Sequence, residues 1–332
     1  MKFNSKALLA AAGMAAFAFS PASATEGGLT ATPPGAFIGS SAGVPPPGIY
    51  MFNQVFTVQT NLTGPGNALI NPTGTKTGVQ AAVDAQGFLF VPGWTFLGAT
   101  YDAVIVVPWV MDSVGSPVNF QAAGLFNTYI VPAELSWKLG TSGFAVKTGL
   151  GIYLPDGSSG GFNGLGIVAN PYWTFQPELI VSYLANGWNL SVAMYDEINT
   201  TNQITHYTTG NIFHADFTAT KTIGNWTFGP VAYYIGQVTD DTCNVGCIGS
   251  TLLHAQRYNR FAVGGLLGYN FGPASLSIWA ATDVLADAKN DAALAALGAD
   301  PSTTISGTTV FATLSYRLWA PEEPAKAPMF HK

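Results

Sequence analysis

The chain has 332 residues, of which 48% are hydrophobic and 9% charged, and its formal net charge at pH 7 is −6. Soluble domains have about 25% charged residues, so this composition is unusual for a protein that is surrounded by water. A nucleic-acid partner is disfavoured, because binding to phosphates needs clustered Lys and Arg, and here acidic residues outnumber basic ones by 18 to 12.

The N-terminus has the pattern of a secretory signal peptide. Lys2 and Lys6 precede an apolar run, and the small residues Ala-Ser-Ala follow it at 22–24, which is typical of a cleavage site. A membrane anchor is the weaker alternative, because the apolar run is short and no stop-transfer segment follows it. We therefore expect residues 1–24 to be removed and the mature chain to begin near Thr25.

No later segment is suited to cross a membrane as a helix. The longest apolar run, AVIVVPWVM at 103–111, contains a proline and is shorter than the roughly 20 residues that a spanning helix needs. In lipid every backbone N–H and C=O must be paired within the protein, so the remaining spanning structure is a closed β-barrel. Residues 25–47 are rich in Gly, Pro, Ala and Ser, which indicates an irregular segment. This segment is either a plug in the barrel lumen or a periplasmic tail.

Short breaks with Gly or Pro alternate with longer polar breaks along residues 48–319. Eleven such breaks separate twelve strands and leave both ends on the side of the short turns. This is the topology of bacterial outer-membrane barrels, with short periplasmic turns and longer extracellular loops. The sequence therefore predicts an all-β fold, a transmembrane antiparallel up-and-down β-barrel that forms one domain. The predicted strands are 48–60, 77–90, 94–109, 121–138, 143–154, 164–184, 188–196, 206–222, 226–238, 255–271, 274–284 and 306–319.

Two further segments follow from composition. The alanine-rich stretch 285–297 predicts a short helix in a surface loop. Residues 320–332, with the sequence APEEPAKAPMFHK, predict a flexible C-terminal tail. Most tryptophans lie near predicted strand ends, as in the aromatic girdles at the two membrane interfaces.

Alternation assigns the faces of each strand, because successive side chains point to opposite sides. Before Ala185, the residues Phe175, Leu179 and Val181 share one face, and Gln176 and Glu178 share the other. A soluble β-sandwich would also alternate, but its outer face would carry many more charged residues than this chain has.

Charged side chains on the predicted strands are the candidate lumen residues. An Arg or Lys on the lipid face at the midplane costs about 2–4 kcal/mol, which favours an inward direction whatever the function. These side chains either form a mutually paired network that fills a narrow barrel or line a pathway and set its selectivity. The assigned residues are Asp102, Glu134, Lys147, Glu178, His214, Asp216, Arg260, Asp283 and Arg317.

The remaining chemistry of the sequence is sparse. Cys243 and Cys247, in CNVGC, predict a small loop disulfide in an oxidising compartment, with two free thiols as the alternative. The pair offers too few ligands for a metal site, and no phosphate loop or dinucleotide fingerprint occurs, so we expect no cofactor and no metal. An outer-membrane lipid hydrolase is disfavoured, because His214 is assigned inward and no motif marks a serine nucleophile.

Five segments resemble one known family: PPGIYMFN (46–53), LGATYDAVIVVP (97–108), YWTFQPELIVSYLANGW (172–188), YDEINTTNQITHYTTG (195–210) and YYIGQVTDD (233–241). They are similar to the outer-membrane proteins named for the meta-pathway of phenol degradation, and keep that family's motif order. The resemblance implies a channel that handles aromatic or hydrophobic compounds, with a more distant similarity to long-chain fatty-acid channels. The chain departs from the family in its YLPDGSSGGFN segment, its CNVGC loop and its extended tail.

Two functions follow from these patterns. The first is an outer-membrane channel, not an enzyme, that takes up small hydrophobic or aromatic solutes passively through a polar-lined lumen. The alternative is a structural or interaction barrel with a filled lumen and exposed loops. Either protein would have outer-membrane lipid as a partner.

Overall fold

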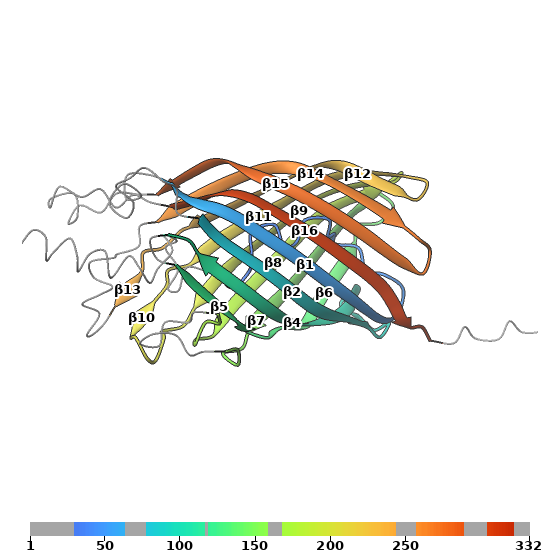
Figure 1. Ribbon diagram of the computed structural model, residues 1–332. Helices are drawn as coiled ribbons and strands as arrows, with labels where there is room; N and C mark the ends of the chain where they lie inside the picture. The colour runs from blue at the N-terminus through green and yellow to red at the C-terminus, as the bar shows by residue number, and fades with distance from the viewer. Residues whose placement is uncertain are drawn as a thin grey trace, which may run out of the picture.

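The computed structural model describes residues 30–63, 78–116, 119–158, 168–243, 257–288 and 304–321. Within them, twelve long strands form one antiparallel barrel that closes on itself, because β2 pairs with β4 as well as with β1 (Figure 1). Each strand pairs with its neighbours in sequence, and β16 returns to pair with β1. The predicted twelve-strand up-and-down barrel is thereby confirmed. No helix among these residues is long and apolar enough to cross a membrane.

The strand bounds are close to the predicted ones. The barrel strands are β1 (Gly48–Thr63), β2 (Gly78–Val91), β4 (Ala99–Val114), β6 (Tyr129–Lys138), β7 (Phe144–Tyr153), β8 (Thr174–Ala185), β9 (Trp188–Asn199), β11 (Ile212–Ile223), β12 (Trp226–Gln237), β14 (Tyr258–Asn270), β15 (Ala274–Ala288) and β16 (Thr304–Trp319). Four short strands accompany them, namely β3 (Thr95–Phe96), β5 (Phe120–Leu125), β10 (Tyr207–Thr208) and β13 (Thr242–Cys243).

Some boundaries differ from the prediction. The strand expected at 121–138 is divided into β5 and β6, and the strand expected from 164 begins at Thr174. One side chain links both changes: the Asn127 amide donates to the Leu154 and Asn170 carbonyls and accepts from the Asn170 backbone N–H. These bonds hold the segments around Asn127, Leu154 and Asn170 in irregular conformations.

The prediction of a helix at 285–297 is wrong at its start, because β15 continues to Ala288. Residues 289–297 lie outside the described part.

The two ends of the barrel differ in their connections. Figure 1 shows the short turns at one end of the barrel, and the strand ends between which the sequence is longer, such as Thr63 and Gly78, lie at the other. A two-residue turn joins β8 to β9 through Asn186 and Gly187, which have φ angles of 52° and 75°. Positive φ at two consecutive residues is the geometry of a two-residue hairpin turn, and Asn-Gly is its preferred sequence. Both ends of the barrel region, Ile49 and Trp319, are paired at this turn end.

The outer face is apolar over most of the barrel. On β8 the outward Leu179 remains 41% exposed, whereas the alternate residues Gln176 and Glu178 are buried. Aromatic residues such as Trp188 and Trp226 are exposed close to the short turns. An exposed apolar belt between aromatic residues is the surface that a membrane-spanning barrel presents to lipid.

The β8–β9 turn provides a test of this fold. An alanine at position 187 would have to adopt the left-handed backbone conformation, and its Cβ would lie 2.7 Å from the Thr222 carbonyl oxygen. Gly187→Ala should therefore destabilise the barrel by about 1–2 kcal/mol. Gly265→Ala is the matched control, because a Cβ there would meet nothing closer than 3.9 Å. Denaturant midpoints of the refolded protein in detergent would measure the difference, and equal midpoints would contradict the turn geometry.

Candidate functional site

An irregular N-terminal segment, residues 30–47, passes through the inside of the barrel before β1 begins (Figure 1). Its first contact is with β9, where the fully buried carboxylate of Glu197 accepts hydrogen bonds from the backbone N–H groups of Ala31 (3.1 Å) and Thr32 (2.7 Å). Backbone groups away from water must find partners, and a carboxylate is a strong acceptor. Glu197 therefore fixes the start of this segment.

The segment next follows β11. Asp216 accepts hydrogen bonds from the backbone N–H groups of Gly35 (3.2 Å) and Phe37 (2.9 Å), and the hydroxyl of Thr218 accepts one from Gly39 (2.9 Å). Asp216 and Thr218 are two residues apart, so both lie on the same face of the strand. Consecutive inward acceptors of β11 thus follow the backbone of the segment.

The next contacts are with strands on the other side of β9. The Ala42 backbone N–H donates to the Ser182 hydroxyl of β8 (2.9 Å), and the Ala42 carbonyl accepts from the Ser136 hydroxyl of β6. The segment up to Ala42 therefore lies along the wall made by β6, β7, β8, β9 and β11, which we call the polar wall.

Inward charges of the polar wall are paired with one another. Lys147 of β7 forms ion pairs with Asp102 (3.1 Å) and Glu134 (3.1 Å), and the three side chains are nearly inaccessible to solvent. One ammonium group between two carboxylates leaves this cluster with a formal negative charge. Such charges are stable in the interior only when they are paired in this way.

Glu178 belongs to a second cluster in the polar wall. Its carboxylate accepts hydrogen bonds from the hydroxyl of Tyr129 and the amide of Gln176 (2.8 Å). The Gln176 amide oxygen accepts from the Thr32 hydroxyl, which is also 2.7 Å from the hydroxyl of Tyr153. Glu178 is thus linked to the N-terminal segment through its neighbours and does not contact it directly.

The same wall holds His214, whose Nε2 lies 3.1 Å from a Glu197 oxygen. The imidazole stacks on the ring of Tyr195 at 4.5 Å between centroids, and the Tyr195 hydroxyl donates to Asp216 (3.1 Å). Both carboxylates that hold the N-terminal segment are therefore supported by further buried side chains.

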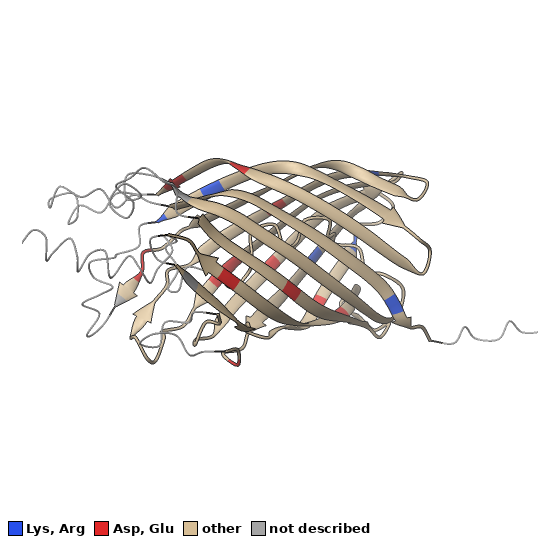
Figure 2. Cartoon of the chain, in the orientation of Figure 1, with Lys and Arg blue, Asp and Glu red and all other residues tan. Residues whose placement is uncertain are grey.

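The remaining sequence-predicted residues lie outside this wall. Arg260 of β14 pairs with Asp283 of β15 (2.7 Å) inside the barrel, and Asp283 also accepts from the Gly307 N–H. Arg317 is exposed near the turn end, where it donates to the Pro47 carbonyl. Figure 2 shows how few charged residues the strands carry.

The opposite wall of the lumen is apolar. On β2 the inward residues are Val79, Ala81, Val83 and Ala85, all buried. Inward valines of β4 and the rings of Phe52 and Phe56 on β1 continue this surface. We call the inward face of β1, of β2 and of β4 from Val104 to Val110 the apolar wall.

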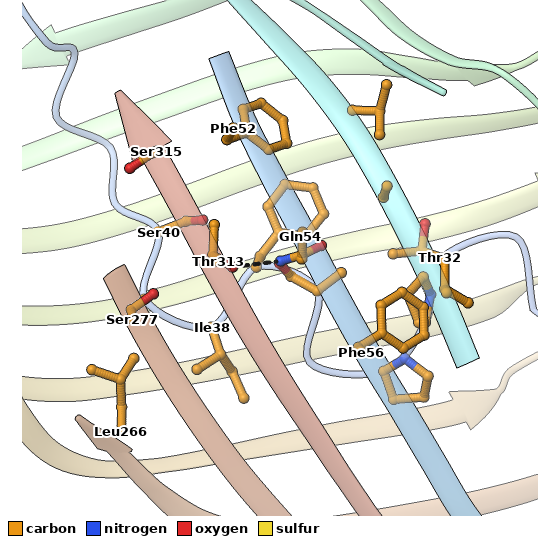
Figure 3. Close-up of a pocket in the computed structure, with 18 of the residues that line it drawn as sticks. Thr32, Ile38, Ser40, Phe52, Gln54, Phe56, Leu266, Ser277, Thr313 and Ser315 are labelled. Atoms are coloured by element: carbon orange, nitrogen blue, oxygen red, sulfur yellow. Dashed lines mark hydrogen bonds between the residues drawn. The ribbon is translucent and has the colours of Figure 1, made fainter. Parts of the chain in front are cut away.

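A cavity of about 810 Å³ lies between the apolar wall and the N-terminal segment. Figure 3 shows Phe52, Gln54 and Phe56 of β1 on one side of it, with Ile38 and Ser40 of the segment among the residues around it. Small polar side chains of β15 and β16 complete the lining near the turn end, among them Ser277, Thr313 and Ser315. The cavity is therefore mostly apolar with a few hydroxyl groups.

Several residues of the site were missed at the sequence level. The predicted strand 188–196 ends one residue before Glu197, which lies in β9 (Trp188–Asn199). Extending the alternation of Ala193 and Tyr195 by two residues would have placed it inward. Of the predicted disulfide, Cys247 and the side chain of Cys243 lie outside the described residues, so that pairing stays a prediction.

Comparison with known proteins gives a family match and one clear structural likeness. A family model described as "Putative MetA-pathway of phenol degradation" matches residues 57–297, and no curated protein matches. The crystal structure of an outer membrane channel from Pseudomonas putida F1 has a TM-score of 0.64 at 10% identity, covering 83% of this chain and 98% of that one. That likeness shows a shared fold.

Two further structures were found at lower similarity. A FadL homologue of Pseudomonas aeruginosa has a TM-score of 0.44 at 10% identity, covering 90% of this chain and 95% of that one. A deletion mutant of the TodX monoaromatic hydrocarbon channel has a TM-score of 0.46 at 9% identity, covering 85% and 94%.

Removing the Glu197 carboxylate should release the start of the N-terminal segment. Hydrogen bonds to charged groups contribute about 1.5–3 kcal/mol each, so Glu197→Ala should raise amide hydrogen exchange at residues 31–32 by at least about tenfold. Glu178→Ala is the control, because it removes a buried carboxylate that makes no direct bond to the segment. Mass spectrometry of peptides from residues 30–40 measures both variants; equal protection in the two would refute the anchoring role.

Proposed function

The chain belongs to the family described as "Putative MetA-pathway of phenol degradation", and on this premise we propose that it is an outer-membrane channel for the passive uptake of small hydrophobic or aromatic compounds. The observation that carries the proposal is the cavity of about 810 Å³ beside the apolar wall. Pockets of about 300–1,000 Å³ with mostly apolar linings bind small organic molecules. A single-ring aromatic compound fits within this volume.

In this proposal the two walls of the lumen have different roles. The polar wall binds the N-terminal segment through Glu197 and Asp216, which narrows the barrel from one side. The apolar wall is left free to face the solute. The pathway therefore differs from a uniformly polar-lined lumen: a hydrophobic solute passes along valines and phenylalanines, and the hydroxyl groups of β15 and β16 contact its polar edge.

The location follows from the outer surface. An apolar belt with aromatic residues near the short turns is suited to lipid, and export is expected from residues 1–24, which lie outside the described part. We place the short turns in the periplasm and the long connections outside the cell, as outer-membrane barrels are oriented.

Two alternative functions, a filled structural barrel and a lipid hydrolase, explain fewer features of the structure. In a barrel with a filled lumen, residues 30–47 and the paired charges would be structural only, and the cavity would have no role. A lipid hydrolase needs a base within reach of a serine and of acyl chains, but His214 is fully buried inside the barrel with its Nε2 facing Glu197.

Uptake into liposomes tests the channel. Reconstituted protein should speed entry of a small phenol over a charged sugar of similar size. Ala81→Trp should slow this entry severalfold, because the indole would occupy the cavity beside the apolar wall. Leu190→Trp is the control, since Leu190 is exposed on the outer face.

One result would favour the filled barrel instead. If neither the intact protein nor a variant that lacks residues 25–45 speeds uptake or shows conductance, while both remain folded by heat-modifiable migration on gels, the channel is excluded.

A further inference from the structure

The outer surface of β1 and β2 carries a run of polar side chains over residues 53–61 and 80–86. The inward residues of these strands line the cavity, among them Phe52 and Phe56 on β1 and Val83 on β2, so the residues between them point outward. We call these outward side chains the polar stripe. They are Asn53, Thr57, Gln59, Asn61, Gln80, Asp84 and Gln86.

Strand register makes the polar stripe continuous. Asn53 is opposite Gln86, Val55 is opposite Asp84, and Gln59 is opposite Gln80. Directly opposed side chains on one face of an antiparallel pair lie within contact distance. The stripe thus runs along both strands as a single surface.

A charged group lies in the middle of the polar stripe. Asp84 is exposed midway along β2 and accepts a hydrogen bond of 2.5 Å from the Asn53 side-chain amide. On the lipid face of a barrel, polar and charged groups are unfavourable, most of all near the midplane. The comparable outward positions of β8 hold Leu179 and Val181, which lipid accepts without cost.

A change in the register of β2 would not remove this unfavourable exposure. A shift of one residue would exchange the two faces and would place Asp84, Gln80 and Gln86 against the cavity. Gly87 also holds this register, because a Cβ there would lie 2.0 Å from the ring of Phe52. The strand keeps its apolar residues inside and leaves its polar residues to be covered from outside.

We propose that the polar stripe binds a second copy of this chain, side by side in the membrane. The stripe is rich in Asn and Gln, whose amides carry both donors and acceptors. Identical surfaces of this kind can therefore satisfy each other about a two-fold axis along the membrane normal, as an isologous interface requires.

Shape supports the same partner. A closed barrel has no free strand edge, so contact between copies must be made by side chains. Outward Ala82 and Ala312 flank Val55 and Asp84, and small residues allow close approach between membrane proteins. The inference rests on the proposed membrane location but not on the solute.

Crosslinking in intact outer membranes tests the interface. In a Cys243→Ser, Cys247→Ser background, Val55→Cys lies directly opposite Asp84 and between Asn53 and Thr57 of the polar stripe. Leu179→Cys is an equally exposed control on β8 (42% and 41% exposed). A short bismaleimide should give a covalent homodimer with Val55→Cys and not with Leu179→Cys. Equal yields from the two positions, or none from either, would overturn the proposal.

A second set of variants separates specific pairing from crowding. Adding Asn53→Leu and Asp84→Leu to Val55→Cys should lower the dimer yield about tenfold, the effect of losing one charge-assisted bond. Thr148→Val, an exposed polar-to-apolar change on β7, should leave the yield unchanged. An undiminished dimer in the double variant overturns the role of the stripe, and a product with the mass of another protein overturns the choice of a second copy. Phenol uptake by the same variants shows separately whether the channel is intact.

Discussion

The hydrogen bonds that Glu197 and Asp216 accept from the N-terminal segment determine how the lumen is divided. An irregular segment brings backbone N–H groups into the barrel interior, and each of them needs an acceptor there. The carboxylates of β9 and β11 meet that need at Ala31, Thr32 and Phe37. Because the segment is held to these strands, the space beside β1, β2 and β4 stays open.

This arrangement explains why one barrel has two inner chemistries. The polar wall carries carboxylates, hydroxyls and amides because it must bind both backbone and other charges, such as Lys147 with Asp102 and Glu134. The apolar wall contacts the backbone of the segment through Gln54, whose amide donates to the Ala36 carbonyl (3.5 Å), and consists otherwise mostly of valine, alanine and phenylalanine. In the proposed channel, the hydrophobic solute and the N-terminal segment therefore contact different side chains on opposite sides of the lumen.

The strand order could be read from the sequence because turn chemistry and strand length repeat. Asn186-Gly187 marks a hairpin by itself, and low charge with strict alternation on β8 indicates lipid on one side. The partners of each inward residue could not be read, because Glu178 and Tyr129 meet only when the barrel closes. Arg317 shows the limit of alternation: it lies on an inward register but close to the turn end, where its long side chain reaches the Pro47 carbonyl.

Asp84 shows a different limit, because the rule that charges turn away from lipid assumes that the lumen is the polar side. Beside β2 the lumen is apolar. An inward Asp84 would therefore face the proposed solute path. Two demands therefore act on one strand with a side-chain period of two: an apolar inner face for the cavity and an apolar outer face for lipid. A strand that was apolar on both faces would satisfy both demands. The sequence GVQAAVDAQGFLFV instead keeps Gln80, Asp84 and Gln86 on the outside. These side chains avoid the free-energy cost of contact with lipid only if another surface covers them. In our proposal, the inner face of β2 lines the solute path and its outer face contacts the second copy.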